Sequence, residues 1–403
     1  MRHDQTQWLI HFVRDLDIDQ DFPEIREGEF DYFARCELQY GDTTAFSVLK
    51  TVVRLGGLIA GYSFRNGKTT IYGEHPVVCA TEMPLYSFAQ YTRDRASVRD
   101  ISAYGIAFLK SEFYEAGGRP VIYGLSQQYE YKRNDSFCRI IRPEYLPVQE
   151  QYRYVVYNPT STNWIDWSHE REWRWKVKCP DRDYIWCTVR EDLETTQLPG
   201  VPLFRGKLYG GVFTKLCVIV WNHREAEEIQ ELLTGFYLAG ANNYSTPFDS
   251  NLLEKSTIIV LEDVVDAVEN RKELNAQTIE GLEKAHLLGS IILTEPPQNA
   301  AQLIDSAFQA ASSVGEKAAV EFIEKYNNYN GLSGYATVST YEIMNPLIQF
   351  MIRNGKASGP YDGIVDINIK SQWSFSQLID YNEYINSAVA ESLQKNLVQL
   401  GAN

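Results

Sequence analysis

The chain has 403 residues, of which 44% are hydrophobic, and its formal net charge is −15 at pH 7. This length suits two or three domains, each able to bury a core, and the acidic balance excludes an overall basic surface for nucleic acid but not a local basic groove. No apolar stretch reaches the roughly 18 residues that a membrane-spanning helix needs, and the first residues lack a signal-peptide pattern, so we expect a cytoplasmic protein with no membrane partner.

The first 240 residues predict short strands interspersed with helices. The amphipathic segment 45–58 predicts a helix that ends at Gly56-Gly57, and a second helix is expected to begin near Met83-Pro84-Leu85. Apolar runs predict strands at 6–14, 76–81, 104–110, 119–124, 170–178, 183–189 and 214–221, with the strand at 183–189 paired to the one at 170–178. A short helix or turn is expected at 111–118 and a Glu-rich helix at 223–237.

The composition and the predicted elements change after about residue 250. Gly, Asn, Ser and Pro cluster between 238 and 255, which predicts a domain boundary there. Beyond it, strand patterns appear at 256–263 and 364–369, and helical patterns at 276–288, 298–313, 316–327, 340–354 and 384–399. We therefore predict an α+β protein, with an N-terminal domain over 1–245 and an acidic, mainly helical accessory domain over 246–403.

The six cysteines show no C-x-x-C spacing. This pattern indicates buried, reduced thiols, and it predicts neither disulfides nor a structural metal site.

The segment HEREWRW is the most informative stretch of the chain. Residues alternate between the two faces of a strand, so a strand here would place Glu170, Glu172 and Arg174 on one face and Trp173 and Trp175 on the other. Two carboxylates on one face opposite a packed aromatic face are an unusual arrangement. The alternative is a solvated face of ion pairs, each contributing under about 1 kcal/mol.

Several motifs in this order resemble a known family. They are HFVR, a helix ending in GGL, VVCATEMPLY, YGIAF, GGRPVIYG and IDWSHEREWRW. Over about residues 6–225 the chain resembles the AbiGi-type abortive phage-infection family and bacterial domains close to the DarT-like ADP-ribosyltransferases. The resemblance implies an ADP-ribosyltransferase-like split β-sheet with NAD, as substrate, in the cleft between its halves.

The resemblance also implies a set of site residues. The triad would be His11 or Arg14, then Tyr104, then a glutamate, for which Glu172 is preferred and Glu170 is the alternative. His169 is an additional candidate beside them.

The chemistry of NAD cleavage explains these residue types. Breaking the nicotinamide–ribose bond develops positive charge on the ribose, which a carboxylate such as Glu172 stabilises, while Glu170 acts as a general base or orients the acceptor. Tyr104 would stack on nicotinamide, His11 would bind a ribose hydroxyl, and Arg14 would pair with the pyrophosphate. No metal ion is needed.

Most of these residues also have a structural interpretation. His11 lies between Ile10 and Phe12 and could be a core histidine. Arg14 could pair with a neighbouring aspartate. Glu82 is predicted to lie at a helix N-terminus, where its charge favours the helix dipole, or to line the NAD cleft. Arg119 could brace the turn before its strand.

The stretch 129–157 interleaves Tyr with Lys and Arg. This composition suits contact with nucleic acid, and it equally describes a solvated loop.

The leading hypothesis is an NAD-dependent ADP-ribosyltransferase toxin of a bacterial anti-phage system that modifies nucleic acid or protein and has a cognate antitoxin or chaperone protein as a possible partner. A second hypothesis is a catalytically inactive binding module that acts as an antitoxin or phage sensor. A third is a nuclease or an NAD glycohydrolase, which would use the same carboxylates on water.

Overall fold

The computed structural model describes residues 6–17, 42–65, 68–94, 102–125, 130–131, 138–160, 164–178, 182–188, 195–270, 284–326, 337–361, 363–369 and 379–398. The chain forms two compact units, one from Met1–Leu233 with Ala241–Ser290 and the other from Thr234–Gly240 with Ile291–Asn403. The predicted α+β class is confirmed, since both helices and multistranded sheets occur. In the described part of the chain, no helix combines the length and apolar character needed to cross a membrane.

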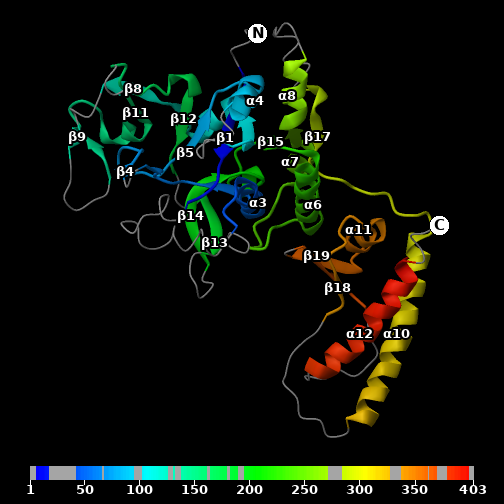
Figure 1. The fold of residues 1–403 in the computed structure, drawn as a ribbon. Helices are drawn as coiled ribbons and strands as arrows, with labels where there is room; N and C mark the ends of the chain where they lie inside the picture. Colours follow the sequence, from blue (N-terminus) through cyan, green and yellow to red (C-terminus); the bar gives the residue numbers. More distant parts are fainter. Residues whose placement is uncertain are drawn as a thin grey trace. The chain divides into compact units, whose positions relative to one another are not determined.

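An eight-stranded sheet forms the centre of the first unit (Figure 1). Its pairings are antiparallel except that of β15 with β16. In spatial order the strands are β17 (Leu287–Gly289), β16 (Thr257–Val260), β15 (Leu216–Val220), β6 (Tyr104–Leu109), β1 (Trp8–Val13), β5 (Val78–Thr81), β12 (Glu172–Trp175) and β7 (Arg119–Pro120).

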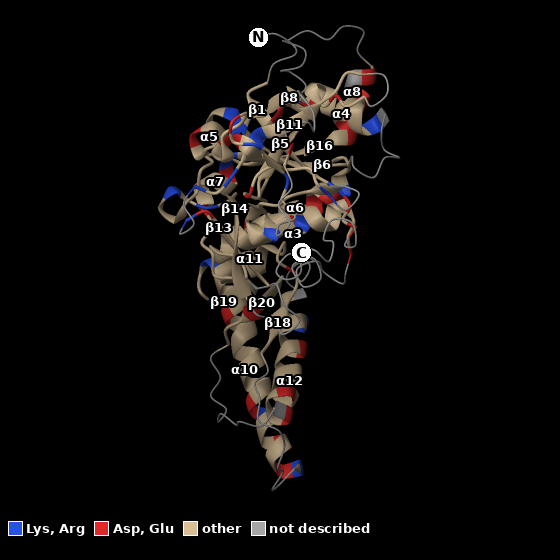
Figure 2. Ribbon diagram, turned by 90° about the vertical axis from the view of Figure 1, so that its left-hand side faces the viewer, with Lys and Arg blue, Asp and Glu red and all other residues tan. Residues whose placement is uncertain are grey.

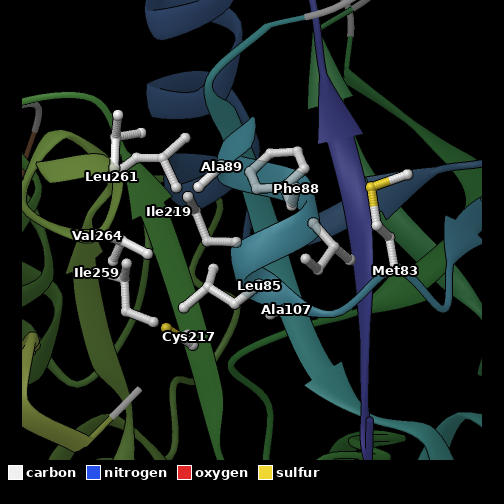
Figure 3. Close-up of a cluster of buried hydrophobic side chains, with 12 residues drawn as sticks. Met83, Leu85, Phe88, Ala89, Ala107, Cys217, Ile219, Ile259, Leu261 and Val264 are labelled. Carbon is white, nitrogen blue, oxygen red and sulfur yellow. The ribbon is translucent and has the colours of Figure 1, made fainter. Parts of the chain in front are cut away.

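One face of this sheet carries an apolar cluster beneath α4 (Leu85–Asp94) and α8 (Leu261–Glu269). Ile10, Ala107, Cys217 and Ile259 come from four neighbouring strands, and Phe88 of α4 is fully buried against them (Figure 3). Each large apolar side chain buried here contributes about 1.5–3 kcal/mol relative to an exposed one.

Helix α3 (Ala45–Leu55) contacts β1 and β6, and α5 (Lys110–Ala116) contacts β6. Both helices end, as predicted, at a glycine in the left-handed region, Gly56 with φ 65° and Gly117 with φ 113°. The predicted helix at 223–237 is α6 (His223–Ala239).

Smaller sheets complete the first unit. Strands β13 (Tyr184–Thr188), β14 (Thr195–Pro202) and β2 (Gly57–Ile59) form one of them. Strand β8 (Ile122–Leu125) pairs in parallel with β11 (Tyr154–Tyr157). Two-stranded ladders join β3 (Phe64–Arg65) to β4 (Lys68–Thr69) and β9 (Glu130–Tyr131) to β10 (Ile140–Ile141).

The predicted pairing of 183–189 with the Glu-x-Glu strand is wrong. Strand β13 pairs with β14 instead, because its inward residues Ile185 and Cys187, both 0% exposed, pack in a separate cluster with Leu55 and Leu198. The backbone of Gly57 lies against Ile185, leaving no room there for a larger side chain.

Among the described residues, the last turns of α6 belong to the second unit, which also contains three other helices and a small sheet. They are α10 (Ala300–Lys325), α11 (Pro346–Arg353), α12 (Ile379–Val398) and the antiparallel strands β18 (Ser339–Thr340), β20 (Ile364–Ile367) and β19 (Ala357–Tyr361). Acidic residues outnumber basic ones on α10 and α12 (Figure 2).

Two helix predictions in this unit need correction. The helices predicted at 298–313 and 316–327 are one helix, α10, because Gly315 is buried in its interior and does not end it. The helix predicted at 340–354 begins only at Pro346, where the Asn345 side chain accepts a hydrogen bond from Leu347 N and caps it.

The domain boundary lies later in the chain than the composition suggests. Residues 241–290 belong to the first unit, since β16 extends the central sheet beside β15, and β17 follows β16. Before β16 comes α7 (Ser250–Lys255), and α8 follows at Leu261 inside the predicted strand 256–263. Most of the helix predicted at 276–288 lies outside the described residues, and its end forms β17.

Candidate functional site

A cavity of about 270 Å³ opens where β5 leads into α4. Antiparallel pairing sets Thr81 opposite Glu172, so the end of β5 meets the start of β12 and Glu82 N donates to Arg171 O at 3.3 Å. Two of the motifs behind the family resemblance, TEMPLY and HEREWRW, therefore converge here. The lining residues are Glu82, Met83, Pro84, Tyr86, Ser87, Tyr91, His169 and Arg171.

Glu82 is held by two donors from neighbouring elements. Lys110 Nζ donates to its Oε1 at 2.7 Å, and Trp173 Nε1 donates to its Oε2 at 3.0 Å. The side chain is 18% exposed. This carboxylate is thus oriented as a fixed negative charge at the cavity, and it lies three residues before α4 begins.

His169 lies among aromatic rings. Its ring centroid is 5.8 Å from that of Tyr91 and 6.2 Å from that of Trp167. The short 3-10 turn that presents it, Ser168–Glu170, is stabilised by Asp166, whose Oδ1 accepts from Ser168 N at 2.9 Å and from Ser168 Oγ at 2.6 Å. These hydrogen bonds lower the pKa of Asp166 below its usual value.

The prediction that Glu170 shares a strand face with Glu172 is wrong. Glu170 ends the 3-10 turn, and Arg171 follows in the left-handed region with φ 46°, so strand β12 starts only at Glu172. Thr81 Oγ1 donates to Glu170 O and fixes this bend against β5. The alternation of side chains cannot be extended through such a bend.

Glu172 and Arg174 do share a face of β12, as predicted, and they form a bidentate ion pair. Arg174 Nε lies 2.7 Å from Glu172 Oε1, and Nη2 lies 3.1 Å from Oε2. Arg174 is 4% exposed, and its Nη1 donates to Tyr152 O and Tyr154 O. Burial alone would lower the pKa of Arg174, but Glu172 and Cys79 together raise it. Both oxygens of Glu172 are thereby engaged.

His11 and Tyr104 lie on the opposite face of the sheet from Glu172. Ile10, Thr81 and Glu172 form one row across β1, β5 and β12, and alternation turns His11 to the other side. His11 Nδ1 lies 2.7 Å from Cys79 O. Tyr104, opposite Val13, donates from its hydroxyl to Glu225 Oε1 of α6 at 2.8 Å. Burial and Glu225 both raise the pKa of Tyr104.

The side chains of the two remaining basic candidates, Arg14 and Arg119, donate hydrogen bonds to backbone carbonyls. Arg14 is half-buried, and its Nη1 donates to Asp15 O at 3.2 Å. Arg119 braces its turn, since Nη1 donates to Tyr114 O and Gly118 O, each at 2.7 Å. The structure thus gathers Glu82 and His169 in one cavity beside the Glu170 bend, and it does not bring His11, Arg14 or Tyr104 to it.

Sequence reasoning missed Tyr86, Tyr91 and Arg171 as lining residues. The sequence did contain a signal for the two tyrosines, because Tyr86 and Tyr91 both lie in the first two turns of the helix predicted after Met83-Pro84-Leu85.

Part of the tyrosine-rich stretch 129–157 is core. Tyr152 is 4% and Tyr154 is 7% exposed, whereas Tyr131 and Tyr145 are exposed. Buried Gln151 bonds both the amide and the carbonyl of Ile141, which ties the segment down.

Metal-ligating groups gather at one place in the described residues. Single ligand atoms of His223, Glu262 and Asp263 lie within 4.8 Å of one another. His223 Nε2 already contacts Asp263 at 3.0 Å, and exposed acidic groups of this kind are common without an ion, so we assign no metal site. Cys79, Cys138, Cys187 and Cys217 are free thiols.

We expect His11 to make the protein less stable in acid. Burial lowers the pKa of His11, and the hydrogen bond to Cys79 O only partly offsets this. The unfolded chain therefore binds a proton below about pH 6.5, where the folded His11 stays neutral, and the free energy of unfolding falls as the pH drops. Urea unfolding of His11→Asn between pH 8 and 5 should show a shallower pH dependence than wild type.

The slope should shrink without vanishing, because burial also lowers the pKa of His75. An unchanged slope in His11→Asn would show that His11 titrates alike in the folded and unfolded states.

Comparison of the chain with models of known protein families, with curated proteins and with solved structures finds no match.

Proposed function

We propose that this protein is an NAD-dependent ADP-ribosyltransferase toxin of a bacterial anti-phage system, with the Glu82 cavity as its NAD site and nucleic acid or protein as its acceptor. The observation that supports this most is the set of groups that line one cavity: a carboxylate held by two donors, an imidazole, a guanidinium and two phenol rings. The resemblance over residues 6–225 supports the same activity.

Each group has a use in the reaction. As the C1′–N bond breaks, its electron pair leaves with nicotinamide and positive charge develops on the ribose, which the Glu82 carboxylate would stabilise. The ring of Tyr86 or Tyr91 would stack on nicotinamide, and Arg171 would pair with a phosphate. His169 would accept the proton that the acceptor nucleophile loses when it attacks C1′. Glu172 would act through Arg174, holding β12 in place.

A binding module is the second candidate, as an antitoxin or a sensor of phage components. The observation that favours it is that both oxygens of Glu172 and both of Glu82 already have donors. In that case the cavity would recognise a ligand or partner without turning it over.

The test is transfer of label from NAD, with the purified protein and cell extract treated in parallel with nuclease or protease. We expect transfer to one acceptor class, and Glu82→Gln should reduce it about 100-fold or more. Tyr104→Phe is the matched control, because its hydroxyl bonds Glu225 and Tyr104 does not line the Glu82 cavity; it should retain transfer.

Loss of transfer in Tyr104→Phe but not in Glu82→Gln would place the site at Tyr104 and not in the Glu82 cavity. No label transfer and no nicotinamide release by wild type would favour the binding module. If wild type transfers label, Glu170→Gln and Glu172→Gln separate direct participation from structural support. Loss of transfer with folding intact would indicate participation, whereas Glu172→Gln is expected to lose folding because it breaks the Glu172–Arg174 pair.

A further inference from the structure

A second cavity in the first unit, of about 550 Å³, has the opposite electrostatic character from the chain as a whole. Three cations line it, Arg182, Arg205 and Lys207, and no carboxylate does among the described residues. In a chain of net charge −15 this is a local basic site. Lys and Arg also appear beside β13 and β14 in Figure 2. None of its lining residues lines the Glu82 cavity.

Arg205 is buried, and no acidic side chain pairs with it among the residues that the structure describes. The residue is 4% exposed, and its Nε and Nη2 atoms have no hydrogen-bond partner among the residues that the structure describes. Its Cζ lies 5.4 Å from the centroid of the Tyr184 ring. Burial lowers its pKa, which Tyr184 only partly opposes. A buried guanidinium with two unused donors is destabilising unless an anion compensates it.

The two unused donors have the geometry that binds an oxyanion. Nε–H and one Nη2–H point in parallel from the same edge of the planar guanidinium, and this fork matches two oxygens of a phosphate or carboxylate. Both atoms are shielded from water. An anion would therefore need a small movement of the covering side chains, and it would gain two charge-assisted hydrogen bonds in a dry setting.

The walls of this cavity are fixed by backbone contacts. On one side buried Asn242 accepts from Tyr244 N and Thr246 N through Oδ1, each at 3.0 Å, and donates to Arg54 O and Leu55 O. On the other side the Lys207–Tyr209 turn ends at Gly210, with φ 81°. A preformed shape of this kind reduces the entropy lost on binding.

Aromatic rings supply a surface for a flat group. Tyr184 and Trp186 project from the same face of β13, with ring centroids 6.1 Å apart and planes at 89°. Tyr244, whose hydroxyl lies 2.7 Å from Thr188 Oγ1, lines the cavity as well. Nucleobases stack on such rings, and each stacked base contributes about 1–3 kcal/mol in single-stranded complexes.

We propose that this cavity binds a nucleoside phosphate, with a phosphate on Arg205 and the base against Tyr184 and Trp186. The volume lies in the range of small-molecule sites, about 300–1,000 Å³. This site is separate from the NAD cavity proposed above and does not depend on the proposed function, so it would serve as an effector site for a free nucleotide.

The experiment is calorimetric titration of the full chain with ATP, AMP, adenosine and inorganic phosphate. We expect ATP and AMP to bind more tightly than adenosine or phosphate, because only they engage both the guanidinium and the rings. Arg205→Lys should weaken binding at least about tenfold, since lysine cannot form the bidentate contact. Glu82→Gln should leave ATP binding unchanged, which separates this site from the NAD cavity.

Thermal unfolding of Arg205→Met distinguishes a ligand-binding residue from a structural one. Removing an uncompensated buried cation should keep or raise the melting temperature of the free protein and abolish its increase with ATP. Arg224→Met, at a side chain that is 89% exposed, is the matched control and should preserve that increase. A lower melting temperature for Arg205→Met with ATP binding retained, or no binding of any probe by wild type, would overturn the proposal.

Discussion

Replacing the buried Arg174 with methionine is expected to lower the free energy of unfolding by about 3–5 kcal/mol, because it leaves the partly buried Glu172 carboxylate without its partner. Glu172 has only 14% of its side chain exposed and uses both oxygens on this guanidinium. The change also strips a donor from Tyr152 O and Tyr154 O. Urea unfolding followed by tryptophan fluorescence measures the loss.

The matched control is Lys50→Met. Lys50 and Glu228 form an ion pair at 3.2 Å with side chains 36% and 37% exposed, and losing it should change stability by under about 1 kcal/mol. The double variant Arg174→Met with Glu172→Leu should recover most of the loss, since an apolar pair can replace a buried ion pair. A double variant no more stable than Arg174→Met would mean that the two backbone contacts, not the ion pair, account for the effect.

Gly211→Ala should destabilise the protein by about 3 kcal/mol or more. A Cβ at Gly211 would lie 1.7 Å from Arg205 O and 2.5 Å from Arg205 C, and backbone atoms cannot move aside as a flexible side chain can. The Gly211 N–H also bonds Gly206 O at 3.0 Å and closes this turn.

Gly61→Ala is the comparison for this substitution. A Cβ there meets nothing within 4 Å, and the backbone is outside the left-handed region, so the variant should match wild type or gain about 0.4–1 kcal/mol. Thermal unfolding of both variants measures the difference. Equal stability of the two would show that the Arg205 turn can shift to admit a methyl group.

Local patterns predicted the single elements well. Strands β1, β6 and β15 and helices α3 and α6 lie within about two residues of their predicted ends, because apolar periodicity and the glycines after α3 and α5 act over short distances. Which strands pair with each other depends on contacts between residues that are distant in the sequence. The alternation in 183–189 reveals a strand, but not that Leu198 rather than Trp173 lies beside it.

The candidate site was predictable in part for the same reason. Glu82 and His169 lie in recognisable motifs, so the sequence alone indicates that they are candidate site residues. Their meeting depends on the register of β5 with β12, and the displacement of Glu170 depends on the single left-handed residue Arg171. Non-glycine residues adopt that conformation rarely, and nothing in HEREWRW signals it.

The four residues of β12 leave this strand little freedom to evolve. Trp173 holds Glu82 on one side, while Glu172 and Arg174 form their pair on the other and Trp175, 2% exposed, lies in the core. Selection for a cavity therefore acts on Trp173, and selection for folding acts on the other three residues of the same tetrapeptide. Homologous sequences should vary more in the residues that flank Glu172–Trp175 than in these four residues. A one-residue insertion there would move the side chains that follow it to the opposite faces of the sheet.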